Sequence, residues 1–135
     1  MGRFIDTIYA IPHTQYIAMP KPYIPNDKWS QRAAAEGYRA RSVYKLIELD
    51  MRQSLLKPAM IVLDIGAAPG SWLQYAAERV GPKGKVIGVD LQDIKPVGPN
   101  VVTYKADVFD AEGLATILKR EGVVTVDLIL SDMAP

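Results

Sequence analysis

The sequence predicts an α/β fold in which a parallel β-sheet carries helices on both of its faces. Four short, almost entirely apolar runs alternate with segments of helical periodicity, as is typical of strands buried on both faces of a sheet. A glycine-rich turn, Asp64 to Trp72 ("DIGAAPGSW"), lies between the first run and the next helical segment, where α/β proteins bind ligands. An aspartate also stands at or just after the end of each run.

Residues 1–27 are predicted to form an extended arm before a single domain that covers residues 28–135. The arm contains Pro12, Pro20, Pro22 and Pro25. Each proline lacks a backbone N–H donor and restricts the residue before it to extended conformations. We therefore expect the arm to be poorly ordered.

Two helices are expected before the first strand. The first follows Asn26 or Asp27, either of which suits an N-cap, and ends at Gly37. The second follows Ser42, also a suitable N-cap, and runs from Val43 to about Met51. Three side chains recur at helical spacing along it and are expected to face the core, namely Tyr44, Ile47 and Met51.

Four strands and two more helices follow, because short apolar runs alternate with helical segments that end at a glycine. Residues 91–100 show no helical pattern and are expected to form a loop. The expected strands are Met60–Ile65, Lys85–Asp90, Val101–Ala106 and Val126–Ser131, and the expected helices are Ser71–Val80, closed by Gly81, and Ala111–Arg120, closed by Gly122.

The composition is that of an ordinary globular protein, with 49% hydrophobic and 23% charged residues. The sequence has no cysteine, which excludes disulfides and cysteine-based zinc sites, and His13 is its single histidine, which argues against a Ser-His-Asp triad. No run approaches the roughly 18 to 20 apolar residues that span a bilayer, and no signal-peptide pattern is present. We expect no metal, no membrane association and a cytoplasmic location.

Charge is divided unevenly along the chain. Residues 1–60 carry nine Lys or Arg against five Asp or Glu, a net charge of +4, whereas residues 61–135 carry seven against ten, a net charge of −3. A basic first part suggests a surface that meets an anion such as a nucleic-acid backbone. Ordinary solvated faces explain the same split equally well.

The four aspartates are expected to lie at one rim, because ligands of open parallel sheets bind beyond the carboxyl ends of the strands. Asp90 ends the second strand, where two carboxylate oxygens can accept both hydroxyls of a ribose. Asp107 could accept a hydrogen bond from the amino group of a base. Asp64 and Asp132 add negative charge, which favours cationic S-adenosylmethionine over the pyrophosphate of NAD. Any one of these acids could instead be a solvated strand end.

The glycine-rich turn is not a dinucleotide fingerprint, which requires Gly-x-Gly-x-x-Gly. Gly66 and Gly70 are four residues apart and would let a ligand approach the backbone, while Pro69 stiffens the turn. Trp72 could pack on the ligand or, equally well, belong to the core.

Four motifs stand in order along the chain: Tyr38–Leu46 ("YRARSVYKL"), Val62–Trp72 ("VLDIGAAPGSW"), Ile87–Leu91 ("IGVDL") and Leu130–Pro135 ("LSDMAP"). This ordered set resembles the FtsJ-like (RrmJ) ribose 2′-O-methyltransferases of large-subunit ribosomal RNA. The resemblance covers residues 28–135. It implies a Rossmann-like methyltransferase fold, S-adenosylmethionine as cofactor, and a ribose in 23S ribosomal RNA, within the large ribosomal subunit, as substrate.

The resemblance also implies roles for individual residues. It places five residues in the S-adenosylmethionine site: Gly70, Trp72, Asp90, Asp107 and Asp132. The acidic rim and the glycine-rich turn add Asp64 and Gly66 to this set. Lys45 and Asp132 match the first two members of the family's Lys-Asp-Lys-Glu catalytic tetrad. The other two follow the fourth strand in the family, so we expect this chain to lack them and the last strands of the sheet, and to leave an open sheet edge.

A lysine beside an aspartate stays protonated, so Lys45 is expected to orient the reacting groups rather than act as the primary base. Arg32, Arg39 and Arg41 are expected to contact RNA phosphates, with Tyr38 or Tyr44 available to stack on bases; solvated surface roles are equally good interpretations. Two other functions stay open. One is a module that binds S-adenosylmethionine or RNA without turnover, and the other is a nicotinamide-dependent oxidoreductase.

Overall fold

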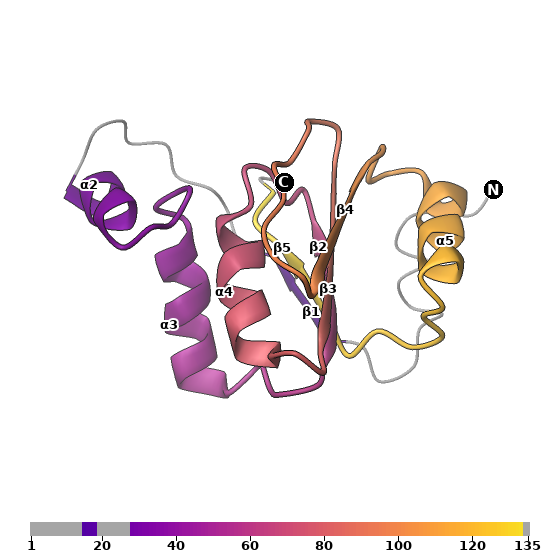
Figure 1. Cartoon of the computed structure of the whole chain (residues 1–135), viewed down its shortest axis with the longest axis horizontal. Coiled ribbons are helices and arrows are strands. Elements are labelled where there is room, and N and C mark those ends of the chain that lie inside the picture. Colours follow the sequence, from indigo (N-terminus) through magenta and orange to yellow (C-terminus); the bar gives the residue numbers. More distant parts are fainter. Residues whose placement is uncertain (1–14, 19–27, 134–135) are drawn as a thin grey trace.

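The computed structural model describes residues 15–18 and 28–133 and contains a five-stranded parallel sheet (Figure 1). The strand order is β1-β5-β2-β3-β4. All four predicted strands are confirmed, two of them with a later start than expected. The strands are β1 (Gln15–Ala18), β2 (Ile61–Ile65), β3 (Lys85–Asp90), β4 (Val101–Lys105) and β5 (Leu128–Ser131).

Helices cover both faces of the sheet. On one face lie α4 (Ser71–Val80) and α3 (Val43–Gln53), with α2 (Lys28–Ala35) at the outer end, and α5 (Ala111–Arg120) lies on the opposite face (Figure 1). Both α4 and α5 have the predicted bounds, and no helix interrupts residues 91–100. Within the part of the chain that the structure describes, no helix is long and apolar enough to cross a membrane.

The core consists of two apolar layers separated by the sheet. Val62 of β2 packs with α3 and α4, whereas the next residue, Leu63, packs with α5. Successive side chains of a strand point to opposite faces, so a strand needs apolar residues at consecutive positions when both faces are covered. The uninterrupted apolar runs of the sequence are therefore strands buried on both faces of a parallel sheet, as predicted.

The predicted core face of α3 is confirmed for Tyr44 and Ile47, which are partly buried and pack against the core, and is wrong for Met51. Met51 is 79% exposed, whereas Val43, Leu46 and Asp50 are buried. The helix presents the stripe that includes an acid, because Asp50 finds hydrogen-bond donors inside the protein. Ser42 stands at the N-cap position, as predicted, but it has helical backbone angles and makes no side-chain capping hydrogen bond. The N-cap predicted for α2 lies outside the described residues.

A strand within the N-terminal arm was not predicted. β1 pairs in parallel with β5, from Gln15 opposite Leu128 to Ala18 opposite Ser131. The expectation of a poorly ordered arm is therefore wrong for residues 15–18, and the rest of the arm lies outside the described residues. β1 also covers the edge of β5 that was expected to be open to pairing.

The buried carboxylate of Asp50 joins α3, α4 and the chain that leaves α3. Its Oδ1 accepts a hydrogen bond from the backbone N–H of Leu56 at 2.8 Å, and its Oδ2 accepts one from the Tyr75 hydroxyl at 2.7 Å. Arg79 Nε lies 3.3 Å from the same Oδ2. Three donors, two on α4 and one in the loop after α3, thus converge on one side chain that is 4% exposed.

This arrangement predicts a loss of stability in alkaline solution. Burial, followed by the hydrogen bond to Asp50, raises the pKa of Tyr75 from 10.0 to about 12. The unfolded chain then loses this proton first, so the stabilisation is complete below pH 10.0 and is lost as the pH rises toward about 12. Urea unfolding across that window should show a steeper decline for the wild type than for Tyr75→Phe. Equal slopes would contradict the assignment.

Candidate functional site

The glycine-rich turn folds over the carboxyl ends of β2 and β3. The backbone N–H groups of Gly66 and Ala67 both donate to the carbonyl oxygen of Val89, at 2.8 and 3.1 Å. Gly66 has φ +74°, and a Cβ there would lie 2.3 Å from Cγ of Met133. Both the backbone angle and the close contact therefore require glycine at this position.

Asp90 fastens this turn to the loop that follows β3. Its Oδ2 accepts a hydrogen bond from Ala68 N–H at 2.9 Å, and its Oδ1 accepts one from Gln92 N–H at 2.8 Å. A carboxylate has about four acceptor sites, of which these bonds use two. The half-buried Asp90 can therefore accept further hydrogen bonds from a ligand, as the sequence predicted for ribose hydroxyls.

A pocket of about 420 Å³ opens beside Asp90. This volume is within the range of about 300–1,000 Å³ that small-molecule sites occupy. Of the predicted cofactor residues, the pocket brings together Gly66, Asp90 and Asp132. Its remaining lining residues are Ala68, Pro69, Leu91, Gln92, Val108, Phe109 and Met133.

Sequence reasoning missed the apolar wall of this pocket. Leu91 and Phe109 are 64% and 68% exposed although they are large and apolar. Exposed apolar side chains beside a polar rim are typical of a ligand site. The signal was available, because each follows a predicted rim aspartate within two residues.

Asp107 acts on the pocket indirectly. It is exposed and is not among the pocket-lining residues, and its Oδ1 accepts a hydrogen bond from Phe109 N–H at 2.9 Å. The bond forms a local turn that holds Val108 and Phe109. Asp107 therefore stabilises the turn beside the pocket and does not line the pocket itself.

Two acids are buried beneath the turn. Asp64 is 1% exposed and Asp132 is 6% exposed. Both line a small cavity of about 10 Å³ together with Ser42 and Ser71, and Asp132 also reaches the larger pocket. The structure thus places Asp64 under the turn because β2 ends inside the core, whereas Asp132 connects the core with the pocket.

Trp72 belongs to the core, the second of the two interpretations that its sequence position allowed. The residue is 3% exposed, and its Nε1–H donates to the carbonyl oxygen of Ser42 at 2.9 Å. This bond ties the first turn of α4 to the start of α3. Trp72 does not line the 420 Å³ pocket.

Arg39 contacts protein carbonyls, which corrects its predicted role as a phosphate ligand. Its guanidinium donates to the carbonyl oxygens of Pro69, Lys95 and Pro96 at 3.0, 2.7 and 2.7 Å. The side chain thereby joins the glycine-rich turn to the loop after β3. Gly70, with φ +115°, makes room for it, since a Cβ there would lie 2.9 Å from the Arg39 Nη1.

Arg32 is also engaged within the protein. Its Nε lies 2.7 Å from Glu36 Oε1, one helical turn away, and its guanidinium lies over the ring of Tyr44. Arg41 and Lys45 are half-buried at the beginning of the α3 region. Lys45 lies one turn after Ser42, which lines the small cavity with Asp132.

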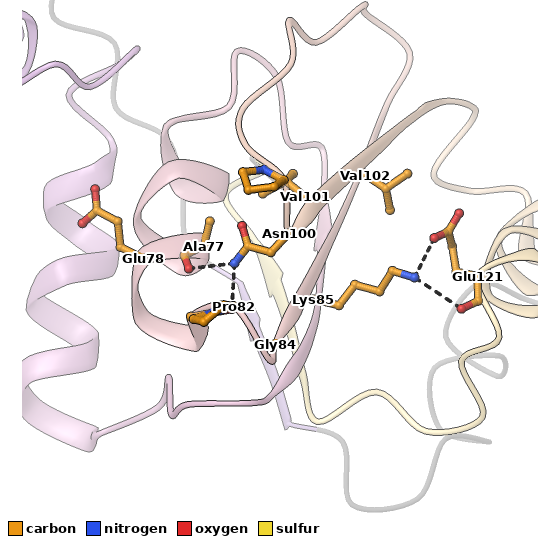
Figure 2. Close-up of a pocket in the computed structure, with 11 residues that line it drawn as sticks. Ala77, Glu78, Pro82, Gly84, Lys85, Asn100, Val101, Val102 and Glu121 are labelled. Carbon is orange, nitrogen blue, oxygen red and sulfur yellow. Dashed lines mark hydrogen bonds and ion pairs between the residues drawn. The ribbon is translucent and has the colours of Figure 1, made fainter.

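A larger cavity, of about 680 Å³, lies at the opposite end of the sheet, where β3 and β4 begin (Figure 2). Its polar side chains serve the fold. Asn100 donates to the carbonyl oxygens of Ala77 and Gly81 at the end of α4, and Lys85 forms an ion pair with Glu121 at 2.8 Å. The pairing with Lys85 and the hydrogen bond from Tyr104 hold the pKa of Glu121 below its usual value.

Among residues 15–18 and 28–133, no three acidic or histidine side chains gather in a way that could hold a metal ion.

The chain is similar to proteins of one family. Residues 38–135 match the FtsJ-like methyltransferases. Proteins named ribosomal RNA large subunit methyltransferase E from Azoarcus sp. (strain BH72) and Haloquadratum walsbyi are 50% and 46% identical to this chain over 110 residues, which are 82% and 81% of it. The same residues cover 53% and 43% of those relatives, so the chain spans about half the length of the curated relatives it matches.

A solved structure supports the same assignment. The crystal structure described as a ribosomal RNA methyltransferase from Plasmodium falciparum superimposes with a TM-score of 0.65 and 39% identity, over 73% of this chain and 57% of that one. Three of the four motifs that suggested the resemblance contribute residues to the 420 Å³ pocket, through Gly66, Asp90 and Asp132. The chain belongs to the FtsJ-like methyltransferase family.

Proposed function

We propose that this chain binds S-adenosylmethionine and takes part in the 2′-O-methylation of a ribose in large-subunit ribosomal RNA. The observation that carries the proposal is the Asp90 carboxylate at the mouth of a 420 Å³ pocket, at the carboxyl ends of the strands. The family and the names of the relatives support the same reaction. We further propose that the reaction takes place in the cytoplasm.

The glycine-rich turn itself favours this cofactor over a dinucleotide. A dinucleotide turn offers free backbone N–H groups to a pyrophosphate. Here the N–H groups of Gly66 and Ala67 bind Val89, that of Ala68 binds Asp90, and Pro69 has none. The acids at the rim, Asp90 and Asp132, attract sulfonium and ammonium groups and repel phosphates. The nicotinamide-dependent oxidoreductase is disfavoured on both grounds.

In the proposed reaction the residues of this chain position and stabilise the reacting groups. When bound, S-adenosylmethionine supplies an electrophilic methyl group, and transfer to an oxygen requires the two reactants in line. Asp90 would hold the ribose of the cofactor and Asp132 its cationic end. Lys45 would orient the substrate hydroxyl and stabilise developing charge. Arg41 would contact a phosphate of the RNA.

Methyl transfer from labelled S-adenosylmethionine to undermethylated large ribosomal subunits tests the proposal. The assay compares this chain with a version extended by the C-terminal segment of a methyltransferase E relative, and cofactor binding is measured on both by calorimetry. Transfer by either protein supports the proposed reaction, and transfer by the extended version alone identifies this chain as the cofactor-binding part. Cofactor binding without transfer by either protein would favour a binding module. Absence of cofactor binding would overturn the proposal.

Arg39 offers a separate prediction. Removing its three carbonyl contacts in Arg39→Ala should weaken S-adenosylmethionine binding about tenfold, because the two loops that form the pocket lose their connection. Arg39→Lys should behave like Arg39→Ala, since an ammonium cannot reproduce the planar fork. Arg52→Ala is the matched control, because Arg52 is exposed and pairs with Glu48 on the same helix.

The salt dependence of RNA binding tests whether Arg39 contacts an RNA phosphate. A phosphate-contacting arginine contributes to the slope of affinity against salt, and its removal makes that slope shallower. Arg39→Ala should leave the slope unchanged. A shallower slope together with unchanged cofactor affinity would restore the role of Arg39 as a phosphate ligand.

A further inference from the structure

An aromatic cluster lies at the outer end of the helical layer, and none of its side chains lines the cofactor pocket. It consists of Trp29, Arg32, Tyr38 and Tyr44, and we call it the Trp29 cluster. The Trp29 and Tyr44 rings are tilted at 52° with centroids 5.6 Å apart, and the Tyr38 and Tyr44 rings meet edge-on at 6.4 Å. α2, which carries Trp29, is the outermost helix of this layer (Figure 1).

Internal contacts hold the cluster in place. The Arg32 guanidinium lies 4.7 Å from the Tyr44 ring centroid and 5.7 Å from that of Trp29. Glu36 accepts hydrogen bonds from Arg32 at 2.7 Å and from the Tyr44 hydroxyl at 2.9 Å. The Arg32 contact, followed by that of Tyr44, keeps the pKa of Glu36 below its usual value, so the ion pair is charged near neutral pH.

Trp29 is the part of the cluster that solvent reaches. It is 42% exposed, one of five large apolar residues so exposed within the described part of the chain. A tryptophan held in place by a cation and a second ring presents its exposed aromatic surface at little entropic cost. Such a surface is suited to a flat, aromatic ligand group.

The charge around the cluster selects an anionic partner. Residues 28–45 contain five Lys or Arg and one Asp or Glu, a net charge of +4. The Lys28 ammonium lies 5.7 Å from the Trp29 ring centroid. A platform of aromatic rings among cations is the arrangement by which proteins bind single-stranded nucleic acid, where bases stack on rings and cations follow the phosphates.

We propose that Trp29 is a stacking platform for an unpaired nucleobase of the RNA substrate. The inference rests on the proposed function and extends it to a residue before the family match, which begins at residue 38. Arg32 is a positioning residue that holds the platform against Tyr44, while Lys28 is available to the adjacent phosphate. A protein partner on this basic surface is the alternative outcome.

The two tryptophans of the chain make the contact directly measurable. Trp72 is 3% exposed and Trp29 is 42% exposed, so a ligand that stacks on the surface quenches the fluorescence of Trp29 and leaves that of Trp72. Titration of the full chain with a single-stranded 12-residue oligouridine, excited at the red edge of tryptophan absorption, should quench part of the emission. Trp29→Phe should abolish the quenching and largely retain affinity, because phenylalanine also stacks.

Fluorescence anisotropy of the labelled oligouridine then measures affinity. Trp29→Ala should weaken binding about tenfold at fixed salt. Met51→Ala is the control, since Met51 is also an exposed apolar side chain, on α3, and it should bind like the wild type. A duplex RNA of the same length should show no dependence on Trp29. Wild-type affinity in Trp29→Ala, or equal dependence on Trp29 for duplex and single strand, would overturn the inference.

Cofactor calorimetry on the same variants separates this inference from the proposed function. Unchanged S-adenosylmethionine binding by Trp29→Ala shows that the variant is folded. Cofactor binding by the wild type without any oligouridine binding would overturn the Trp29 assignment and leave the methyltransferase proposal intact. RNA binding that depends on Trp29 in a chain that binds no cofactor would support the platform and overturn the proposed function.

Discussion

Asp90→Ala is expected to bind S-adenosylmethionine at least about 100-fold more weakly than the wild type, because two hydrogen bonds to a charged carboxylate contribute about 1.5–3 kcal/mol each and 1.4 kcal/mol corresponds to a tenfold change. The variant loses the proposed acceptors of the ribose hydroxyls. It also releases the backbone N–H groups of Ala68 and Gln92, which Asp90 holds at 2.9 and 2.8 Å. Isothermal titration calorimetry with S-adenosylmethionine measures the effect.

Two variants control for charge and for loop structure. Asp93→Ala removes an acid three residues further along, whose side chain is 87% exposed and lies 3.7 Å from Lys105, and it should bind the cofactor like the wild type. Asp90→Asn keeps one acceptor oxygen and should show an intermediate loss. If Asp90→Ala and Asp93→Ala bind equally well, the ribose-binding role of Asp90 is wrong.

The sequence was most informative where local patterns decide the structure. α4 and α5 begin and end where periodicity and closing glycines predicted, and β3 has the predicted bounds. The short strand β1 carried no comparable signal, since its pairing depends on β5 at the far end of the chain. Strand pairing between distant segments cannot be deduced from the residues of either segment alone.

The sequence identified which residues lie in or near the site better than it identified what each of them does. Asp90 and Asp132 line the pocket as expected, but Arg39 and Trp72 turned out to hold the pocket loops and helices together. An arginine suits a phosphate and a set of carbonyl oxygens equally well, and a tryptophan suits a ligand and a core. Only the positions of the neighbouring backbone atoms distinguish these alternatives.

The contacts of Arg39 and Asp90 together describe how the glycine-rich turn is kept in shape. Arg39 holds the carbonyl oxygen of Pro69, and Asp90 holds the N–H of Ala68. Both side chains also bind the loop after β3, through Lys95 and Gln92 respectively. The turn is thus fixed before a ligand arrives, which lowers the entropy lost on binding.

The second large effect concerns stability. Asp50→Ala is expected to lower the free energy of unfolding by about 2–6 kcal/mol, because each of two buried donors left without its acceptor costs about 1–3 kcal/mol. The variant leaves the Leu56 N–H and the Tyr75 hydroxyl without the acceptor they share in the wild type. Urea unfolding followed by circular dichroism measures the change.

Arg79→Ala is the matched control for Asp50→Ala. The Arg79 side chain is 52% exposed, so its contact with Asp50 is screened by water, and its removal should cost less than about 1 kcal/mol. A large effect of Asp50→Ala beside a small effect of Arg79→Ala would show that the buried hydrogen bonds, rather than the ion pair, stabilise the junction of α3 and α4. Comparable losses in the two variants would instead assign the stabilisation to the ion pair, and the account of why α3 buries an acid would be wrong.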